Sequence, residues 1–338
     1  MKFHIILEAN NPPERIAELA QLAESYGMEG IWTSNMHDSR DPFVNFVDAA
    51  RATKKIKLGP VAVSPYELHP LKMANALLTL NEISGGRAHI GVGAGDGGTA
   101  TAMGMKAIKR VRATRECVEI IEAAATGEPV QYKGEIYSVM YYHSSWVTKP
   151  SPDIFVCAGG PQMIASSAKY AQGIFVGDHL PAHVAKINKV IKKEQTIISR
   201  EAANFPLLNF WAWHVKEDQA EARAEARIWL AMRATPWPQF YHRDILPEDE
   251  MQIVWDNMGA INTAYYQRDP NITAVPKGIL DRLVDQCAST SSISNLDHEI
   301  ERIQHFKEAG LTDIALRLYD KPDDSIRLIG ERVMPALA

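Results

Sequence analysis

Eight short apolar segments alternate with helical patterns along the chain, and this alternation constrains the fold more than any other feature. The segments are Phe3–Leu7, Gly30–Thr33, Ile56–Val63, Arg87–Val92, Pro152–Ala158, Gly173–Asp178, Leu207–Val215 and Thr312–Leu318. Their apolar residues come in runs and not at every second position, which is typical of parallel strands that are buried on both faces. Eight such units in 338 residues predict an α/β fold, a (β/α)8 TIM barrel with insertions.

The alternative is an open, doubly wound sheet. That fold usually carries Gly-x-Gly-x-x-Gly directly after its first strand, whereas Glu8-Ala9-Asn10-Asn11 follows the first strand here, which favours the barrel. Residues 236–275 fit no strand–helix period and predict an insertion. Because no linker or internal repeat divides the chain, we expect one domain over residues 1–338.

The pattern of apolar residues and prolines predicts the bounds of three helices. We expect Pro42 to begin a helix that runs to Ala50, since proline suits the first helical position. A second helix is expected over Arg112–Thr126, and a single long charged helix over Glu217–Arg233.

The composition narrows the classes of function. A formal charge of −5 gives no support for a nucleic-acid or membrane-surface partner. No run reaches the roughly 18 apolar residues that a membrane span requires, and the N-terminal segment is too short for a signal peptide. Three widely spaced cysteines predict neither a disulfide framework nor a zinc ribbon, so we expect a reduced, cytoplasmic protein.

In a barrel of this kind, ligands bind at the carboxyl ends of the strands. Two of those ends are glycine-rich, Gly93–Thr99 and Ala158–Pro161. Backbone N–H groups at Gly159-Gly160, with a helix beginning at Pro161, suit a phosphate; the alternative is a tight turn without a ligand. Asp96 fits either a ligand contact or the cap of the next segment.

Two further groups of residues are notable. His179 and His183 have a spacing that can bind a metal, but Pro181 lies between them and no glutamate does, so we expect no metal site. Aromatic residues cluster in the second half of the chain, where they either line an apolar pocket at the barrel mouth or pack an insertion or subunit contact. These residues are Tyr141, Tyr142, Trp146, Trp211, Trp213, Trp237 and Trp255.

Taken together, the motifs resemble those of the bacterial-luciferase-like flavin and deazaflavin oxidoreductases. Within them the branch of methylenetetrahydromethanopterin reductase, which uses coenzyme F420, is the most similar. The stretches that carry the resemblance are Ala23–Gly27, Ile31–Thr33, Arg40–Phe43, Ile56–Pro60, Ser64–Tyr66, His69-Pro70, Leu80–Arg87, Gly91–Asp96, Thr126–Pro129, Ala158–Pro161 and Phe240–Pro247.

The resemblance implies a flavin-type ring that lies on a bulge in the third strand. That bulge holds a non-proline cis peptide, which falls at or next to Val61-Ala62. Asp96 and its neighbours would contact the ring or its polyol tail, and Thr99 and the Gly159-Gly160 amides would hold the phosphate. The cofactor contacts predicted in this way are Val61, Ala62, Ser64, Gly95, Asp96, Thr99, Ala158, Gly159, Gly160, Gly177 and Asp178.

One departure from the family concerns the catalytic side. Members that match this well usually carry an Asp-His pair just past the second strand, where this chain has Asn35 and Met36. Neither side chain is a proton donor or acceptor of useful pKa. His37 is the next residue along, and Asn35, Met36 and His37 are therefore the catalytic candidates. Val61 also replaces the glycine that is usual in the bulge.

The main hypothesis is an enzyme that transfers a hydride between F420 and a small organic substrate. The first alternative keeps the fold and uses reduced FMN and oxygen, as a monooxygenase. The second is a non-catalytic protein that binds a cofactor or other ligand, for which the absence of an acid/base pair at Asn35-Met36 argues. The resemblance also implies a homodimer.

Overall fold

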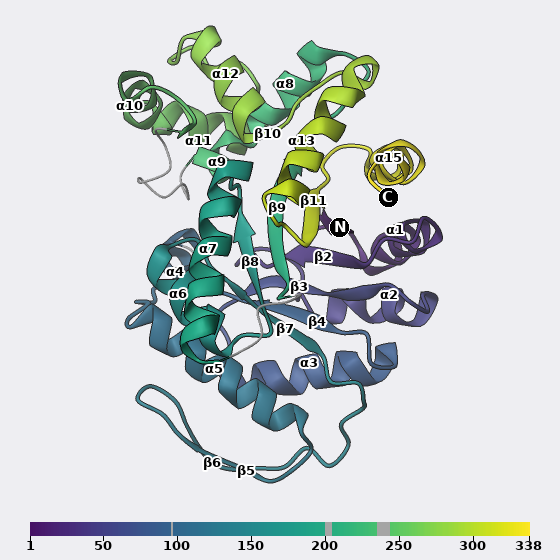
Figure 1. Cartoon of the computed structure of the whole chain (residues 1–338), viewed down its shortest axis with the longest axis vertical. Helices are drawn as coiled ribbons and strands as arrows, with labels where there is room; N and C mark the ends of the chain where they lie inside the picture. The colour runs from purple at the N-terminus through teal and green to yellow at the C-terminus, as the bar shows by residue number, and fades with distance from the viewer. Residues whose placement is uncertain (96, 200–204, 235–243) are drawn as a thin grey trace.

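A computed structural model of the chain describes residues 1–95, 97–199, 205–234 and 244–338. Eight parallel strands form a closed barrel surrounded by helices, and the predicted TIM-barrel fold is confirmed (Figure 1). The sheet closes because β1 and β11 pair in parallel, with Lys2 opposite Asp313 and Ile6 opposite Arg317. In order around the barrel, the strands are β1 (Lys2–Leu7), β2 (Gly30–Ser34), β3 (Lys57–Val63), β4 (His89–Val92), β7 (Asp153–Cys157), β8 (Gly173–Gly177), β9 (Leu207–Trp213) and β11 (Asp313–Arg317).

Helices follow the strands and pack on the outside of the barrel. They are α1 (Pro13–Ser25), α2 (Val47–Ala52), α3 (Pro70–Ser84), α5 (Arg110–Ala125), α6 (Pro161–Tyr170), α7 (Pro181–Ile197), α13 (Leu296–Glu308) and α14 (Pro322–Leu328), with the short α4 (Gly97–Ala102) and α15 (Met334–Ala336). The described part of the chain contains no helix with the length and apolarity that a membrane crossing demands.

The helix expected from Pro42 begins later than predicted. The side chain of Asp41 accepts hydrogen bonds from the backbone N–H groups of Phe43 and Val44, both at 2.9 Å, and this turn delays the first helical residue. A short 3-10 segment (Val44–Phe46) then leads into α2.

Two other elements differ from the prediction. The helix expected over Glu217–Arg233 is split at Trp229 into α8 (Gln219–Ile228) and α9 (Leu230–Ala234). The connection from α5 to β7 carries an antiparallel hairpin, β5 (Val130–Lys133) and β6 (Ser138–Tyr142). The sequence did not predict this hairpin, because its strands are short and only one face is partly buried. A further two-residue strand, β10 (Ala288–Ser289), pairs with the end of β9.

Three groups of buried side chains stabilise the molecule. The largest lies between the barrel and its helices. A smaller one fills the inside of the barrel and is formed by Ile6, Trp32, Val61, Phe155, Phe175, Leu208 and Ala315. A separate apolar cluster joins α8 and α9 to α10 (Glu248–Asp256), α11 (Met258–Gln267) and α12 (Lys277–Cys287). These five helices lie together at one end of the molecule in Figure 1.

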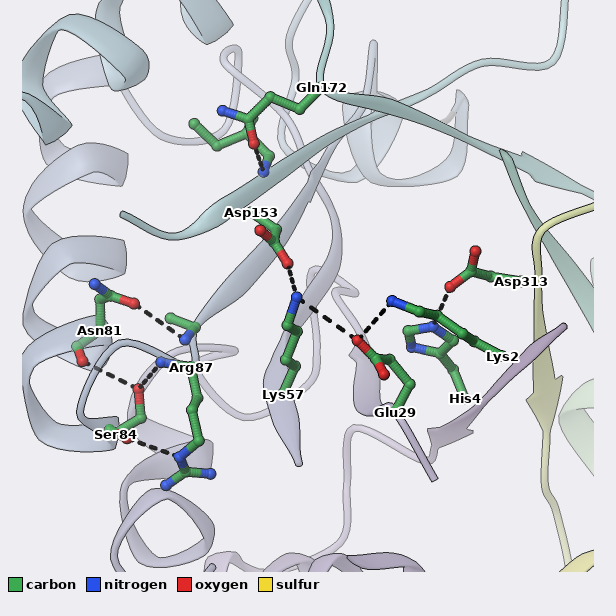
Figure 2. Close-up of polar contacts among 12 residues, drawn as sticks. Lys2, His4, Glu29, Lys57, Asn81, Ser84, Arg87, Asp153, Gln172 and Asp313 are labelled. Carbon is green, nitrogen blue, oxygen red and sulfur yellow. Dashed lines mark hydrogen bonds and ion pairs between the residues drawn. The ribbon is translucent and has the colours of Figure 1, made fainter. Parts of the chain in front are cut away.

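Charged residues line the amino-terminal end of the barrel, and Figure 2 shows how they pair. Glu29 binds Lys2 at 3.0 Å and lies 3.7 Å from Lys57, which also binds Asp153. The buried His4 ring binds Asp313 through Nε2 at 3.0 Å and accepts the indole N–H of Trp32 at Nδ1. These residues border a cavity of about 180 Å³.

The Ser84–Arg87 segment, which the resemblance singles out, has a structural role. Gly85 and Gly86 have φ angles of +67° and +89°, which favour glycine, and they turn the chain from α3 toward β4. The guanidinium of Arg87 then donates to the carbonyls of Ala50, Thr53, Ile56 and Ser84 at 2.7–3.0 Å. This residue therefore ties the connection from α2 to β3 to the connection from α3 to β4.

Candidate active site at the carboxyl end of the barrel

The third strand carries a bulge at its carboxyl end. Its register against β4 shifts between Val61 and Val63, and the Val61–Ala62 peptide bond is cis, as the resemblance implies. The neighbouring strand accommodates the bulge with glycines. A Cβ added at Gly91 would lie 2.8 Å from Val61 Cγ2, and one added at Gly93 would lie 2.8 Å from Ala62 Cβ. The Gly91-Val92-Gly93 sequence is thus required by the bulge itself.

The glycines that follow β7 have a different explanation. A Cβ added at Gly159 or Gly160 would meet no atom within 4 Å, and Gly160 has an ordinary φ of −100°. Neither crowding nor backbone conformation within the chain therefore requires glycine here. Both precede helix α6, whose first N–H groups can bind an anion. Close approach of a ligand to this backbone would account for both residues.

The other predicted cofactor contacts lie around the same half of the mouth. Gly95 has a φ of +78° and lies beside Ser64, whose hydroxyl accepts the N–H of Tyr66 at 3.2 Å. Thr99 is buried in α4, Ala158 is buried at the end of β7, and Gly177 ends β8. Asp96 lies outside the described residues.

Asn35 joins the bulge to a neighbouring carboxylate. Its side-chain N–H group donates to Glu67 Oε2 at 2.7 Å and to the carbonyl of Ala62 at 3.3 Å. An amide cannot exchange a proton at neutral pH, so this geometry gives Asn35 a positioning role beside the cis peptide. An aspartate in the same place would set two carboxylates against each other.

Met36 and His37 point to different surroundings. Met36 lines a cavity at the mouth, whereas His37 is exposed and does not border that cavity. The catalytic role predicted for these two residues stays a prediction.

Asp178 is held by an arginine that the sequence did not single out. Nη1 of Arg233, from α9, lies 2.6 Å from both carboxylate oxygens, and both side chains are buried. The guanidinium also lies 4.3 Å from the centre of the Phe210 ring, which packs against the interior of the barrel. Burial raises the pKa of Asp178, and the charge of Arg233 opposes that rise. The ion pair joins helix α9 to the end of β8.

A second region of the mouth is rich in arginine and aromatic side chains. A cavity of about 210 Å³ lies between the ends of β1, β2 and β11 on one side and helices α9 and α11 on the other. It is lined by Glu8, Ala9, Asn10, Ser34, Met36, Asp38, Ser39, Trp229, Met232, Arg233, Tyr265, Tyr266, Arg268, Arg317 and Tyr319. We call it the mouth cavity.

The predicted aromatic residues are distributed over several places, and one agrees with an expectation: Trp255 packs against the apolar cluster of α8–α12, inside the predicted insertion. Trp211 and Trp213 are buried in the core, and Tyr141 lies exposed on the β5–β6 hairpin, away from the mouth cavity. Trp237 lies outside the described residues. His179 and His183 pack ring against ring with centres 5.8 Å apart, and His183 binds Asp244 at 2.8 Å. Over the described ranges, no three His, Cys, Asp or Glu side chains gather as metal ligands do.

Sequence reasoning missed Trp229, Arg233, Arg268, Arg317 and Tyr319. The last two had a usable signal, because Arg317 ends the eighth strand and Tyr319 follows it. Trp229 and Arg233 lie in the helix predicted over Glu217–Arg233 and Arg268 lies in the predicted insertion, and only the three-dimensional structure brings them to the mouth.

Three comparisons place the chain among known proteins. The family model described as luciferase-like monooxygenase matches residues 1–313. A 5,10-methylenetetrahydromethanopterin reductase from Archaeoglobus fulgidus is 33% identical over 345 residues, with all of both chains covered. The solved structure of the coenzyme F420-dependent tetrahydromethanopterin reductase from Methanopyrus kandleri superposes with a TM-score of 0.83 at 23% identity, covering 100% of this chain and 99% of that one.

A fourth similarity is to a solved F420-dependent secondary alcohol dehydrogenase in complex with an F420–acetone adduct. Its TM-score is 0.78 at 16% identity, with 100% of this chain and 99% of the other covered. At this identity the likeness concerns the fold. The family match covers most of the chain, and the Archaeoglobus relative matches it from end to end. The chain therefore belongs to the luciferase-like monooxygenase family.

Proposed function

We propose that this protein is an oxidoreductase that moves a hydride between coenzyme F420 and a small organic substrate at the carboxyl end of its barrel. The observation that carries the proposal is the bulge of β3 at Val61–Val63, faced by glycines on β4, in a chain that matches a reductase over its full length. The two similar solved structures are both F420-dependent by description, which favours F420 over FMN.

The residues present fit such a cofactor. The backbone of Val61 and Ala62, with Ser64 and Gly95 beside it, would support the ring, and Thr99, Ala158, Gly159, Gly160 and Gly177 would hold the tail and its phosphate. Asp96 is included from the resemblance alone. Asp178 contributes through its ion pair with Arg233, because that pair occupies both of its carboxylate oxygens. When bound, F420 supplies the hydride donor or acceptor.

The chain's own contribution is to position the reactants and keep water away from them. Asn35 holds the carbonyl of Ala62 and so fixes the bulge. Met36 and the aromatic side chains of the mouth cavity provide an apolar surface beside it. In this proposal neither Asn35 nor Met36 moves a proton.

The test is a titration of the purified protein with F420 and with FMN, side by side, followed by oxygen-uptake measurements. We expect F420 to bind at micromolar concentration without oxygen consumption. Tighter binding of FMN with oxygen uptake would instead support a monooxygenase. Tight cofactor binding without turnover over a broad substrate panel would support a ligand-binding protein, and failure of both cofactors to bind would overturn the proposal.

A glycine substitution tests the phosphate position. Gly160→Ala should leave the free energy of unfolding within about 0.5 kcal/mol of the wild type, because the added methyl meets no atom of the chain. It should weaken F420 binding at least about fivefold if the cofactor lies on this backbone. Gly278→Ala, in helix α12, is the matched control and should not alter affinity.

We also propose a single barrel domain with an insertion over residues 236–275, a homodimeric assembly and a cytoplasmic location. The free cysteines Cys117, Cys157 and Cys287 are compatible with a reducing compartment. Light scattering of the purified protein tests the dimer, and fractionation of the source cells tests the location.

A further inference from the structure

Three hydrogen-bond donors at the mouth cavity have no acceptor among the described residues. They are the guanidinium of Arg268, the hydroxyl of Tyr319 and Nε of Arg233; the last two are buried atoms. Buried donors in proteins are almost always satisfied, and leaving one unsatisfied is costly. Of these three donors, the guanidinium of Arg268 is open to the cavity, and the other two are buried atoms in residues that line it.

Arg268 is the most accessible of the three. It follows the last turn of α11 with a φ of +55°, and its guanidinium lies 4.3 Å from the centre of the Trp229 ring and 4.6 Å from that of Tyr265. Stacking engages the flat faces of a guanidinium and leaves its N–H edge available for a bidentate contact. No ion pair or hydrogen bond to the described side chains uses that edge.

The other arginines of the cavity are already paired. Arg233 binds Asp178, and Arg317 binds Glu8. The remaining carboxylate on the lining, Asp38, is exposed and makes no ion pair with Arg268. Arg268 is thus the cation of the cavity that is available to a ligand.

Tyr319, which follows strand β11, lines the same cavity as Arg268. Its ring centre lies 4.6 Å from that of Trp229, so both Tyr319 and Arg268 contact the same indole. Burial raises the pKa of Tyr319, so its hydroxyl keeps the proton that it would donate. Tyr319 thus lines the cavity together with Arg268, and its hydroxyl is buried behind the cavity surface.

We propose that the mouth cavity binds the substrate by an anionic group, a carboxylate or a phosphate, with Arg268 as the charged contact and Tyr319 as a neutral donor. The inference rests on the proposed function for the identity of the ligand as the hydride partner. Its position supports that identity, because the ends of β1, β2 and β11 line the cavity and the predicted cofactor contacts lie at the same, carboxyl, end of the barrel. The substrate is therefore an organic acid or a phosphate ester that the mouth cavity can hold.

The experiment is isothermal titration calorimetry with benzoate, phenyl phosphate and the neutral benzamide, on the wild type and on variants. We expect benzoate or phenyl phosphate to bind at least about tenfold more tightly than benzamide. Preference for benzoate indicates an organic acid, and preference for phenyl phosphate indicates a phosphate ester. Arg268→Gln should lose about 10- to 100-fold of that affinity, and Tyr319→Phe about 3- to 10-fold.

Two variants serve as controls. Arg282→Gln removes another exposed arginine, which binds Glu250 on α10 away from the cavity, and should leave binding unchanged. Asp38→Asn removes a negative charge from the lining and should strengthen anion binding. Thermal melting of each variant shows whether it is folded, and Arg268→Gln should melt like the wild type because Arg268 is exposed.

Equal binding of the three probes, or equal anion binding by Arg268→Gln and wild type, would overturn the inference. A fluorescence titration with F420 on the same preparations separates this failure from failure of the proposed function. Anion binding that depends on Arg268 without F420 binding would leave the anion site intact and remove the proposed activity. F420 binding without anion preference would leave the proposed activity intact and remove the anion site.

Discussion

The two ends of the barrel have cavities of similar size, about 180 Å³ at the amino-terminal end and about 210 Å³ at the mouth, yet their polar groups are arranged differently. At the amino-terminal end the charges form a continuous series of ion pairs from Lys2 through Glu29 and Lys57 to Asp153. At the mouth, the guanidinium of Arg268 borders the cavity without an ion pair in the described part of the chain, and buried donor atoms of Tyr319 and Arg233 beside it lack an acceptor there. Cavity size therefore does not distinguish a binding site here, whereas the state of its hydrogen-bonding groups does.

The difference agrees with a division of labour in barrels, in which one end stabilises the fold and the other binds ligands. One atom at the amino-terminal end is an exception to this division. Nδ1 of His89 is buried beside the amino-terminal cavity and has no hydrogen-bond partner among the described residues. His89 is otherwise held firmly, since Nε2 binds the carbonyl of Ile31 at 3.0 Å and the ring stacks on Trp32 at 3.4 Å. Burial holds the pKa of His89 well below its usual range, so the ring is neutral.

The largest expected effect comes from breaking the buried ion pair at the mouth. Arg233→Gln leaves the carboxylate of Asp178 buried without its cation, which should lower the free energy of unfolding by about 3–5 kcal/mol. Urea denaturation measures this loss. The double variant Asp178→Asn/Arg233→Gln should regain much of it, since no buried charge remains. A loss of unfolding free energy below about 1 kcal/mol in the single variant would show that the ion pair does not stabilise this end of the barrel.

A smaller effect is expected where the bulge meets Asn35. Asn35→Asp places a carboxylate in the position of an amide that lies 2.7 Å from Glu67 Oε2, so two like charges would face each other. We expect a loss of about 1–3 kcal/mol at pH 8 that largely disappears at pH 5, where the two carboxylates can share a proton. Asn35→Ala is the control, because it removes the amide without adding charge. A pH-independent loss would contradict this account.

The next effect concerns acid stability. Burial, with a contribution from His183, lowers the pKa of His179 to about 3, below the ordinary value of 6.5. The unfolded chain therefore binds an extra proton between these two pH values, and the stability due to neutral His179 is lost as the pH falls below 6.5. The slope is at most about 1.4 kcal/mol per pH unit.

His179→Gln removes this titration and keeps the backbone hydrogen bonds to Asn209. The dependence of unfolding free energy on pH, measured by denaturation between pH 7 and pH 5, should become shallower by about 1 kcal/mol per unit. His89, His183 and His214, whose pKa values burial also lowers, should maintain the remaining slope. An unchanged slope in the variant would mean that His179 is accessible to protons in the folded state.

The smallest effect is expected at the amino-terminal end. Lys57→Gln removes a cation from ion pairs whose side chains are about one third exposed, at 35% for Lys57 and 37% for Asp153. Water screens such charges, so the loss should stay below about 1 kcal/mol. Measured by the same urea denaturation as Arg233→Gln, this variant compares the two ends directly. A loss as large as that of Arg233→Gln would remove the contrast between them.

The sequence predicted the barrel because buried parallel strands appear as uninterrupted apolar runs, and all eight runs became strands. It also predicted the glycine-rich half of the mouth, since each glycine follows a strand directly. The arginine-rich half was not predictable in this way. Arg233 reaches Asp178 across 55 positions of sequence, from the end of the helix predicted over Glu217–Arg233, and a single arginine in a charged helix has no periodic signal. Likewise, Trp229 looked like one more residue of a long helix until the structure split that helix.

The pairing of β1 with β11 has a consequence for the synthesis of the protein. Of the eight barrel strands, β1 leaves the ribosome first and its neighbour β11 leaves it last. Until then, one edge of β1 and one edge of β9 have no β11 to bind, and exposed strand edges invite pairing with other chains. Contacts over some 310 positions also slow the final closure of the ring. The barrel is therefore most exposed to pairing with other chains in the interval between the emergence of β9 and that of β11.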